Sequence, residues 1–501
     1  MSIKSKNIIV MGGSVAGLGV GLALTADGHR VTILEADSSP MPADHTEAFE
    51  KWERKGAPQV WHSHALLARL YSQIAEHSPS LIEDLIACGA EELRFTDMAS
   101  RLIEDPVFEP EDEKIVLLAC RRITFEWVLR RHILNTGLVD FRDGVEVTGL
   151  LAAEGSAEGP PRVCGVRLRG KDGVEKTLEG DLVVDASGRR SKLKHWLEGI
   201  GAVPIQEESE PCGIFYTSRF YRLHDGVEPP MLEGGPIVGE DLGYLKVGLF
   251  PGDDRVFSLT LAASPDDDTL RGVVHQPAFE AVAAAVPKVA PWVDPAVSEP
   301  ISKVHAMANL RNTLRRFVVD GEPVALGVVA VGDAAVHANP ITGRGCTFSW
   351  MSAYFLAEAL RESPDDLRGL ALAIDGRVEE EVVPWFRMQV QQDRDAMETE
   401  QALLRGEDPF QATMPDGSNN PKAFIRSMIR EGLLPAIRSD VVVMRRFMRL
   451  MNLLDPPKDL FTDTDFLGRV LAVYNKRQER TPPPLGPSRD EMVGILERLA
   501  A

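Results

Sequence analysis

The fold of this chain of 501 residues is decided by Ile8-Ile9-Val10-Met11-Gly12-Gly13-Ser14-Val15-Ala16-Gly17. The four apolar residues predict a buried strand, and the small and apolar residues that continue to Leu24 predict a helix. Glycines between a strand and a helix allow a tight turn in which the backbone can approach a ligand closely. The stretch therefore predicts the first strand, turn and helix of an α/β domain.

A second strand is predicted at residues 31–34, and it ends in Glu35. Strand, glycine-rich turn, helix, strand and acid together form the dinucleotide-binding fingerprint, in which the helix N-terminus accepts a pyrophosphate and the acid binds a ribose. Ser14 stands where the second glycine of the pattern normally lies, and its hydroxyl is small enough to leave the backbone close to a pyrophosphate. The predicted dinucleotide contacts are Gly12, Gly13, Ser14, Ala16, Gly17, Glu35 and Ala36.

A second ligand loop follows the apolar run at residues 328–331. An acid at the end of a strand can hydrogen-bond sugar or ribityl hydroxyls, and glycines let the backbone approach a flat ligand. The helix predicted at residues 346–360 points its N-terminus at that ligand and favours negative charge there, as on one edge of a reduced flavin. The loop therefore predicts a flavin cradle made by Gly332, Asp333, Pro340, Gly343, Gly345 and Cys346.

Two further stretches place charge next to predicted secondary structure. Arg121 and Arg122 precede a helix, where cations oppose the helix dipole, so we expect them to bind a phosphate or a flavin edge; an exposed basic helix start is the alternative. A strand at residues 182–184 ends in Asp185, followed by Gly188. The basic residues that come next, Arg189 and Arg190, suit the phosphate of a bound dinucleotide or of a visiting nicotinamide.

Residues 36–59 are polar and rich in charge, and they predict a surface excursion. His62 and His64 follow, before a helix predicted at residues 65–74. We interpret them as hydrogen-bonded histidines at a helix start, with a place beside the flavin as the alternative and no further ligands for a metal.

Alternating strands at residues 214–221, 244–250 and 255–262 predict an inserted antiparallel sheet. Its aromatic residues are expected to form core individually and a substrate wall collectively. The last hundred residues are helical, and residues 422–449 reverse the acidic sign of the chain. They predict a helical cap or, alternatively, a basic apolar lid that makes peripheral membrane contact or admits a lipophilic substrate.

The composition excludes several classes of protein. A formal net charge of −20 argues against nucleic acid as a partner. Five cysteines without a paired C-x-x-C pattern predict a reducing compartment, with no disulfide framework and no metal site. The early glycine motif leaves no room for a signal peptide, and no apolar run is long enough to span a membrane. We therefore expect a cytoplasmic protein.

The order of the three motifs resembles that of the FAD-dependent aromatic-hydroxylase superfamily, the para-hydroxybenzoate hydroxylase-like flavoproteins. Residues 61–67 and 339–345 are most similar to its bacterial hydroxylase and epoxidase branch. The resemblance implies that Glu35 holds the adenosine half of FAD, Arg122 lies at the flavin, and Asp333 binds the ribityl chain. It also implies that the reacting isoalloxazine ring is lined by Pro340, Gly343, Arg344 and Gly345. It also associates Asp185 with FAD and NAD(P)H. The implied fold is a Rossmann-like FAD-binding domain in two parts (1–202 and 321–405), an inserted mostly antiparallel β-sheet substrate domain (203–320) and a C-terminal helical region (406–501).

The resemblance further implies a monooxygenase. NAD(P)H or a separate reductase would reduce FAD, molecular oxygen would form a flavin hydroperoxide, and one oxygen atom would pass to a small hydrophobic organic substrate. A flavin-dependent reductase or dehydrogenase of isoprenoid-type double bonds and a non-catalytic redox sensor are the alternatives. Flavin-dependent halogenases carry two tryptophans two residues apart, and none of the seven tryptophans here has that spacing, so a halogenase is not expected.

Overall fold

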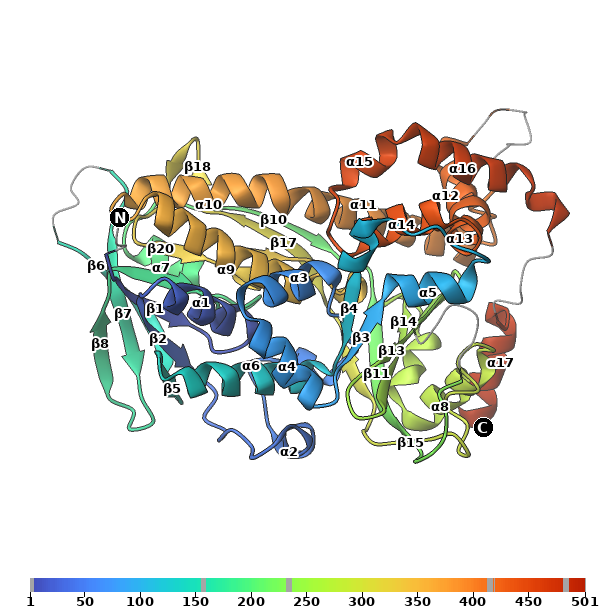
Figure 1. The fold of residues 1–501 in the computed structure, drawn as a ribbon, viewed down its shortest axis with the longest axis horizontal. Helices are drawn as coiled ribbons and strands as arrows, with labels where there is room; N and C mark the ends of the chain where they lie inside the picture. Colours follow the sequence, from blue (N-terminus) through green and yellow to red (C-terminus); the bar gives the residue numbers. More distant parts are fainter. Residues whose placement is uncertain are drawn as a thin grey trace.

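The structure is a computed structural model of the chain, and it describes residues 4–154, 159–230, 237–411, 418, 420–480 and 486–500. An α/β body and a body built on an antiparallel sheet lie side by side. The helices of residues 421–475 lie together at the upper right, and the last helix (residues 489–500) lies apart from them, beside the antiparallel sheet (Figure 1). This is the predicted mixture of a parallel Rossmann-like sheet, antiparallel sheets and a helical C-terminal region, and the prediction of the fold class is confirmed.

The α/β body is organised around a five-stranded parallel sheet with the order β20-β9-β1-β2-β5. Its strands are β1 (Asn7–Met11), β2 (Arg30–Glu35), β5 (Val139–Asp143), β9 (Leu182–Asp185) and β20 (Val328–Ala330). The helices packed on one another beside it are α1 (Val15–Ala26), α6 (Arg122–Thr136) and α9 (Gly345–Glu362). Central strands such as β1 are buried on both faces, which explains their continuous apolar sequence.

Smaller elements complete this body. A hairpin with its turn around Asp172 joins β7 to β8 in a three-stranded sheet. The remaining strands are β3 (Glu91–Arg94), β4 (Val116–Ala119), β6 (Glu146–Ala152), β7 (Val163–Arg169), β8 (Glu175–Glu179), β18 (Val318–Val319) and β19 (Glu322–Pro323). The remaining helices are α2 (His45–Lys51), α3 (Ala68–His77), α4 (Pro79–Ala87), α5 (Phe95–Leu102) and α7 (Leu193–Gly199).

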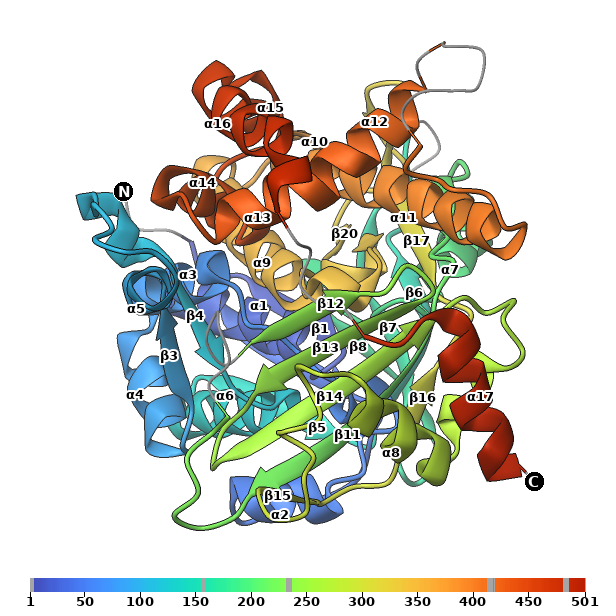
Figure 2. The same cartoon turned by 90° about the vertical axis from the view of Figure 1, so that its right-hand side faces the viewer.

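The antiparallel sheet has the order β12-β13-β14-β11-β15, with β16 paired to β11. Its strands are β11 (Phe215–Leu223), β12 (Val238–Asp241), β13 (Leu245–Pro251), β14 (Val256–Ala263), β15 (Ser298–Pro300) and β16 (His305–Met307). Helices α8 (Gln276–Ala285) and α17 (Arg489–Ala500) cover one face, where alternate strand residues such as Val247 and Leu249 form an apolar core (Figure 2). The opposite face is turned toward the α/β body, and residues of that body bind it through Ser218 and Thr260.

A third sheet connects the two bodies. It has the order β10-β17-β21 and consists of β10 (Gln206–Pro211), β17 (Arg311–Arg316) and β21 (Val336–His337). Two helices follow α9, namely α10 (Leu367–Glu381) and α11 (Val383–Leu404), and Pro384 lies in the first turn of α11. Proline is tolerated there because the first amides of a helix have no intrahelical partner, and the chain breaks between the two helices just before it.

The predicted surface excursion at residues 36–59 is wrong for its second half. Helix α2 and the segment after it pack into the protein, and Trp52 and Arg54 are only 1% and 3% exposed. The charge of Arg54 misled the prediction because its partners, Glu35, Asp37 and Glu126, neutralise it inside the protein. The helix predicted at residues 65–74 begins and ends three residues later, as α3.

Most of the C-terminal helices pack on one another, whereas α17 lies on the antiparallel sheet. The elements packed together are α12 (Pro421–Met428), a π-helical turn (Ile429–Leu433), α13 (Leu434–Ile437), α14 (Val441–Met451), α15 (Pro457–Thr462) and α16 (Thr464–Asn475). Arg445 of α14 pairs with buried Asp112 at 2.6 Å, and Arg449 pairs with Asp455 at 2.7 Å. These pairs hold the basic side of α14 against protein, as in a packed cap. Within the described residues, no helix is both long and apolar enough to span a bilayer. The polar stretch of residues 406–421, rich in Pro, Asp and Asn, lies partly outside the described residues.

Candidate functional site

The predicted ligand residues meet at one edge of the parallel sheet. Met11 is in register with Leu34 on one side and with Asp185 on the other, and Ala330 is in register with Asp185. The turns that follow β1, β2, β9 and β20 therefore leave the sheet together. In open α/β sheets this edge, outside the carboxyl ends of the strands, is where ligands bind.

The glycines of the first turn are required by close backbone approaches. Gly12 has φ +107°, and a Cβ there would lie 2.5 Å from the carbonyl oxygen of Ala186. A Cβ on Gly17 would lie 1.8 Å from the carbonyl oxygen of Gly12, which no side chain could accommodate. The turn thus brings β1, α1 and the end of β9 together, as the fingerprint predicts.

Glu35 lies beside this turn and is 5% exposed. Its Oε2 accepts hydrogen bonds from the amide of Gly13 at 3.0 Å and from Nη2 of Arg54 at 3.1 Å, and its Oε1 accepts from the amide of Asp37 at 2.9 Å. A carboxylate has about four lone-pair sites, so acceptor capacity remains for a ribose hydroxyl. Ala36, the last predicted contact here, is exposed next to it.

Ser14 connects the turn to a buried charge cluster that we did not predict from the sequence. Its hydroxyl donates to Oε2 of Glu126 at 2.7 Å and accepts from Nη2 of Arg122 at 3.0 Å. Glu126 also binds Nε of Arg54 at 2.7 Å and Nη1 of Arg122 at 2.9 Å. Burial raises the pKa of Glu126, but the charges of Arg54, Arg122 and Arg130 outweigh it and hold the pKa at about 2.

Glu126 and Arg130 had a usable signal in the sequence. They follow Arg122 at steps of four along α6, so the three charged side chains share one helix face. Arg130 donates from Nη2 to the carbonyl oxygen of Gly13 at 2.8 Å. Helix α6 therefore supports the glycine-rich turn through charged groups that are themselves neutralised.

The second loop supplies a free carboxylate. The side chain of Asp333 is 31% exposed, and its carboxylate makes no hydrogen bond with the described part of the chain; Nε2 of His337 is 3.9 Å away. A Cβ on Gly345 would lie 3.9 Å from Oδ1 of Asp333, so the acid stands directly at the N-terminus of α9. Burial raises the pKa of the Cys346 thiol at the same helix end, and the positive charge of Arg122 opposes this rise.

These features fit the dinucleotide-linked flavin that the motifs predict. Asp333 offers an acceptor for ribityl hydroxyls, the amides at the start of α9 offer donors for a negative ring edge, and Arg122 stands between the two glycine loops. Gly332 packs against Ala16 of α1, since a Cβ there would lie 3.1 Å from the Ala16 Cβ. The two glycine-containing loops therefore form one continuous surface.

The loop before α9 has two sides. Gly343 has φ +69°, and a Cβ there would lie 3.2 Å from the carbonyl oxygen of Ala65, so the segment around residue 65 lies against the loop. Pro340 begins the 3-10 turn Pro340–Thr342 that leads to Gly343. The side chain of Arg344, in contrast, is 0% exposed and turned toward α11, where Nη1 binds Oε1 of Gln389 at 3.1 Å. Arg344 therefore does not present its guanidinium to the cradle.

Arg121 also has a different place from the one expected. Its backbone amide donates to Oδ1 of Asp253 at 2.7 Å, and its Nε donates to Oδ2 of the same residue at 3.0 Å. Asp253 lies in the turn between β13 and β14, and the hydroxyl of Thr124 binds it at 2.9 Å. Arg121 thus joins the α/β body to the antiparallel sheet, and Asp253 neutralises its charge.

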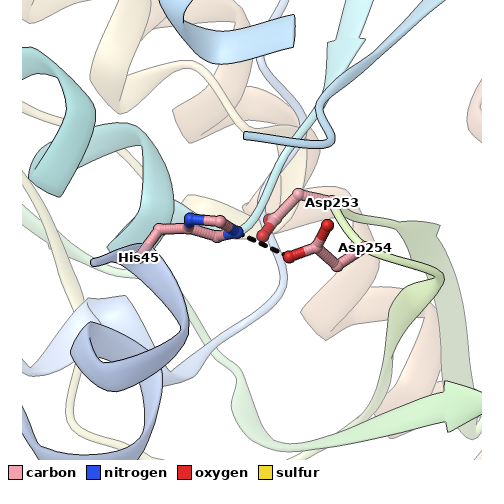
Figure 3. Close-up of side chains that lie close together, drawn as sticks. All are labelled: His45, Asp253 and Asp254. Atoms are coloured by element: carbon pink, nitrogen blue, oxygen red, sulfur yellow. Dashed lines mark hydrogen bonds and ion pairs between the residues drawn. The ribbon is translucent and has the colours of Figure 1, made fainter. Parts of the chain in front are cut away.

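Among the described residues, the side chains of His45, Asp253 and Asp254 have a spacing that could hold a metal ion (Figure 3). Nε2 of His45 is 2.6 Å from Oδ2 of Asp254, while Arg121 occupies both oxygens of Asp253. Because the guanidinium already neutralises the buried acid, we assign this cluster to the contact between the two bodies.

Asp185 is fully buried and holds its own turn. Its Oδ1 accepts from the amide of Ser187 at 2.9 Å and from the Ser187 hydroxyl at 2.5 Å, and its Oδ2 accepts from the Ser191 hydroxyl. Gly188 provides the positive φ of +80° that this turn needs. Asp185 and Gly188 therefore shape the edge of the site without presenting a free carboxylate to a ligand.

A chain of neutral polar groups lies on the sheet face turned toward the cradle. Nδ1 of His62 is 3.0 Å from the Ser218 hydroxyl, which is 2.7 Å from the Thr260 hydroxyl, and Ser63 binds Thr260 at 2.7 Å. Burial, followed by His305, His64 and Arg189, lowers the pKa of His62 to about 3. His64 binds the carbonyl oxygen of His62 at 3.0 Å.

The hydrogen bonds agree with the first interpretation of these histidines, and their place beside a flavin stays a prediction. The two rings are hydrogen-bonded before a helix, and their segment also touches the loop of Gly343. The ring of Trp61 stacks on that of His305, with centroids 5.1 Å apart and an interplanar angle of 3°. The ring of His62 meets that of Tyr216 edge-on at 4.8 Å. Aromatic and neutral polar groups thus form the contact between the segment of residues 61–65 and the sheet.

Comparisons with known proteins agree with this architecture. The chain is 27% identical over 384 residues to Protein Rv3254 of Mycobacterium tuberculosis, covering 72% of this chain and 74% of that protein. Among solved structures it is similar to the myxobacterial chondrochloren halogenase CndH, a FAD-dependent halogenase, with a TM-score of 0.55, 17% identity and coverage of 98% and 99% of the two chains. It is also similar to the anhydrotetracycline hydroxylase OxyS of Streptomyces rimosus, with a TM-score of 0.54, 17% identity and coverage of 90% and 76%.

No protein-family model matches the chain. The likeness to solved structures nevertheless shows the class of fold: the chain has the fold shared by FAD-dependent monooxygenases and FAD-dependent halogenases. The expected likeness to the FAD-dependent hydroxylase superfamily is confirmed at the level of this fold.

Proposed function

We propose that this protein is a FAD-dependent monooxygenase, a hydroxylase or epoxidase that transfers one oxygen atom from molecular oxygen to a small hydrophobic organic substrate. The observation that carries the proposal is the free carboxylate of Asp333 at the N-terminus of α9, opposite the glycine turn of β1 and α1. An unpartnered acid next to a helix N-terminus suits a ligand that brings both hydroxyl donors and a negative edge.

Bound FAD would supply the electron transfer and the reaction with oxygen. Gly12, Gly17 and Glu35 would hold its adenosine half, and Asp333 would bind its ribityl hydroxyls. The amides from Gly345 onward would stabilise negative charge on the ring. The sheet face with Tyr216 and Thr260 would hold the substrate against the ring and keep water out.

The electron donor is part of the proposal. The sequence offers one dinucleotide fingerprint, and FAD would occupy it. NAD(P)H would therefore bind transiently, or a separate reductase would deliver electrons. The turn after β9 suits transient binding of a nicotinamide phosphate. Arg189 is half-buried and Arg190 is exposed, and neither side chain makes a hydrogen bond with the described residues.

Location is a further part of the proposal. The five cysteines, all within the described residues, form no disulfide, in keeping with the reducing cytoplasm that we propose for the protein.

A halogenase is the second candidate because the fold is shared with CndH. The missing pair of closely spaced tryptophans still favours the monooxygenase. A reductase of isoprenoid-type double bonds or a redox sensor would use the same cradle. An assay of the reaction is therefore needed to distinguish the monooxygenase from the halogenase, the reductase and the sensor.

The test is an anaerobic titration of the purified protein, loaded with FAD, with NADPH and then NADH while the visible flavin bands are followed. Bleaching would establish reduction by a nicotinamide, and admission of air with a substrate panel, with and without chloride or bromide, would separate oxygenation from halogenation. Reduction of a double bond without oxygen uptake would favour the reductase. Failure to take up FAD would overturn the proposal.

A further inference from the structure

A cluster of buried polar side chains lies behind the cradle loop, between β17, α11 and the residues before α9. Its exposed fractions are 0% for Asn312, 2% for Asn339, 1% for Gln389, 5% for Asp393 and 0% for Arg344. Burying this many polar groups is unfavourable unless each finds a partner, so the cluster must contribute something specific. None of these residues reaches the glycine turn or the charge cluster around Glu126.

Asp393 is the acceptor at the centre of the cluster. Its Oδ2 accepts a hydrogen bond of 2.6 Å from Nδ2 of Asn312. Its Oδ1 accepts bonds of 2.9 Å from Nδ2 of Asn339 and 2.8 Å from Nε2 of Gln389. Burial raises the pKa of this carboxyl, while the three amide donors and the charge of Arg344 oppose the rise.

An ionised carboxylate can only accept hydrogen bonds, so it dictates the orientation of all three amides. Each amide turns its NH₂ group toward Asp393 and its oxygen away, and every one of those oxygens meets a donor in the loop. Oδ1 of Asn312 accepts from the amide of Asn339 at 2.7 Å, and Oδ1 of Asn339 accepts from the amide of Ile341 at 3.1 Å.

The third amide acts at the far end of the loop. Oε1 of Gln389 accepts from the Thr342 hydroxyl at 2.9 Å and from Nη1 of Arg344 at 3.1 Å. Gln389 thereby lies between the buried cation and the buried carboxylate, and no carboxylate among the described residues pairs with Arg344 directly. Burial lowers the pKa of Arg344 to about 10, and the negative charge of Asp393 opposes this.

We propose that Asp393 is a positioning residue for the flavin cradle: through Asn312, Asn339 and Gln389 it sets the conformation of residues 339–344, and through them the affinity and reduction potential of bound FAD. The inference rests on the proposed function for the identity of the ligand. Its structural part, control of the loop by one carboxylate, does not depend on that identity.

The experiment compares Asp393→Asn with Asp395→Asn on the same helix. The control removes an acid of the same size that pairs with Arg426 of the cap at 2.6 Å and, among the described residues, makes no hydrogen bond with the loop. In Asp393→Asn an NH₂ group replaces one of the two acceptor oxygens and therefore faces the NH₂ group of at least one of the three partner amides. Two donors cannot bind each other, so that partner amide must turn over, which leaves a donor of the loop unpaired.

Three quantities are measured for the two variants and the wild type. They are the hydrogen exchange of the peptide 339–345 in protein without FAD, the FAD dissociation constant, and the midpoint potential of the bound flavin. We expect Asp393→Asn to accelerate exchange at Asn339 and Ile341, to weaken FAD binding by about tenfold, and to shift the potential. Asp395→Asn should match the wild type in all three.

Equal exchange, affinity and potential in Asp393→Asn and the wild type, with only a lower melting temperature, would overturn the proposal. If Asp393→Asn does not fold, Gln389→Met replaces it, and this variant should accelerate exchange at residues 342–344; unchanged exchange would again overturn the proposal. A wild-type protein that binds no FAD would contradict the proposed function, while the exchange measurements would still decide the role of Asp393.

Discussion

The hydroxyl of Ser14 donates a hydrogen bond of 2.7 Å to the carboxylate of Glu126, which lies far away in the chain on α6. The fingerprint normally has glycine at this position. Here the serine side chain is not an obstacle to a pyrophosphate, because Glu126 and Arg122 hold it to one side. The departure from the pattern therefore creates a link between the glycine turn and α6.

This link predicts that Ser14→Gly, although it restores the usual glycine, weakens the site. Loss of a hydrogen bond to a charged group should cost about 2 kcal/mol of stability, because Glu126 loses one of its buried donors. FAD affinity should fall by about tenfold as Arg122 loses an acceptor that orients it. Urea unfolding and FAD titration check both effects, and a variant that binds FAD as tightly as the wild type would show that the hydroxyl plays no part in the site.

Asp333→Ala should yield folded protein that largely lacks FAD, because the only change is removal of an acceptor that the described part of the protein does not use. The flavin-to-protein absorbance ratio after purification measures this. The matched control is Asp365→Ala, at an exposed acid whose contact is an ion pair with Lys6 at 3.3 Å. A fully yellow Asp333→Ala protein would contradict the assignment of the cradle.

Two glycine-to-alanine changes within helices should have opposite effects. Gly17→Ala places a Cβ 1.8 Å from the carbonyl oxygen of Gly12, so it should prevent the turn and abolish FAD binding. Gly376→Ala in α10 meets nothing within 4 Å and should raise stability by about 1 kcal/mol, because alanine restricts the unfolded chain and favours helix. Thermal unfolding of both variants tests the contrast, and a stable, FAD-loaded Gly17→Ala protein would refute the close packing of α1 on the turn.

The lowered pKa of His62 predicts a loss of stability in acid. In the unfolded chain a histidine takes up a proton near pH 6.5, whereas the folded protein accepts it only near pH 3. The unfolded state therefore binds more protons as the pH falls below about 6.5, and stability should decrease by about 1.4 kcal/mol per pH unit from this residue.

His62→Gln, which retains a polar group beside Ser218, should remove this part of the pH dependence. The measurement is the free energy of unfolding at about pH 7 and about pH 5 for the wild type and the variant. The control is His195→Gln on α7, where the side chain is 76% exposed. Identical slopes for the wild type and His62→Gln would contradict a buried, neutral imidazole.

Much of the fold followed from local patterns. The apolar run before Gly12 and the acid after β2 predicted the parallel sheet because buried strands and tight turns impose their residue types locally. The antiparallel strands were found within one or two residues of their observed bounds, because alternation reports which face is buried.

The partners of charged residues could not be found in this way. Arg121 was expected at a ligand and instead binds Asp253, and Arg344 was expected beside the ring and instead lies buried against α11. Arg54 was expected on the surface and instead joins Glu35 to Glu126. Each of these pairs connects segments far apart in the chain, and a charge in a sequence carries no sign of whether water or a distant opposite charge will neutralise it.

The sequence by itself thus determined where the backbone must turn tightly and where an acid ends a strand, since these depend on the residues at those positions. Only the tertiary structure decided which acids remain free for a ligand. The carboxylate of Asp185 accepts hydrogen bonds from the hydroxyls of its own turn, and that of Asp393 accepts them from three amides. The carboxylate of Asp333 accepts none from the described residues. That difference depends on which donors the folded chain brings within hydrogen-bond distance, and it is what makes Asp333 the candidate contact for the flavin.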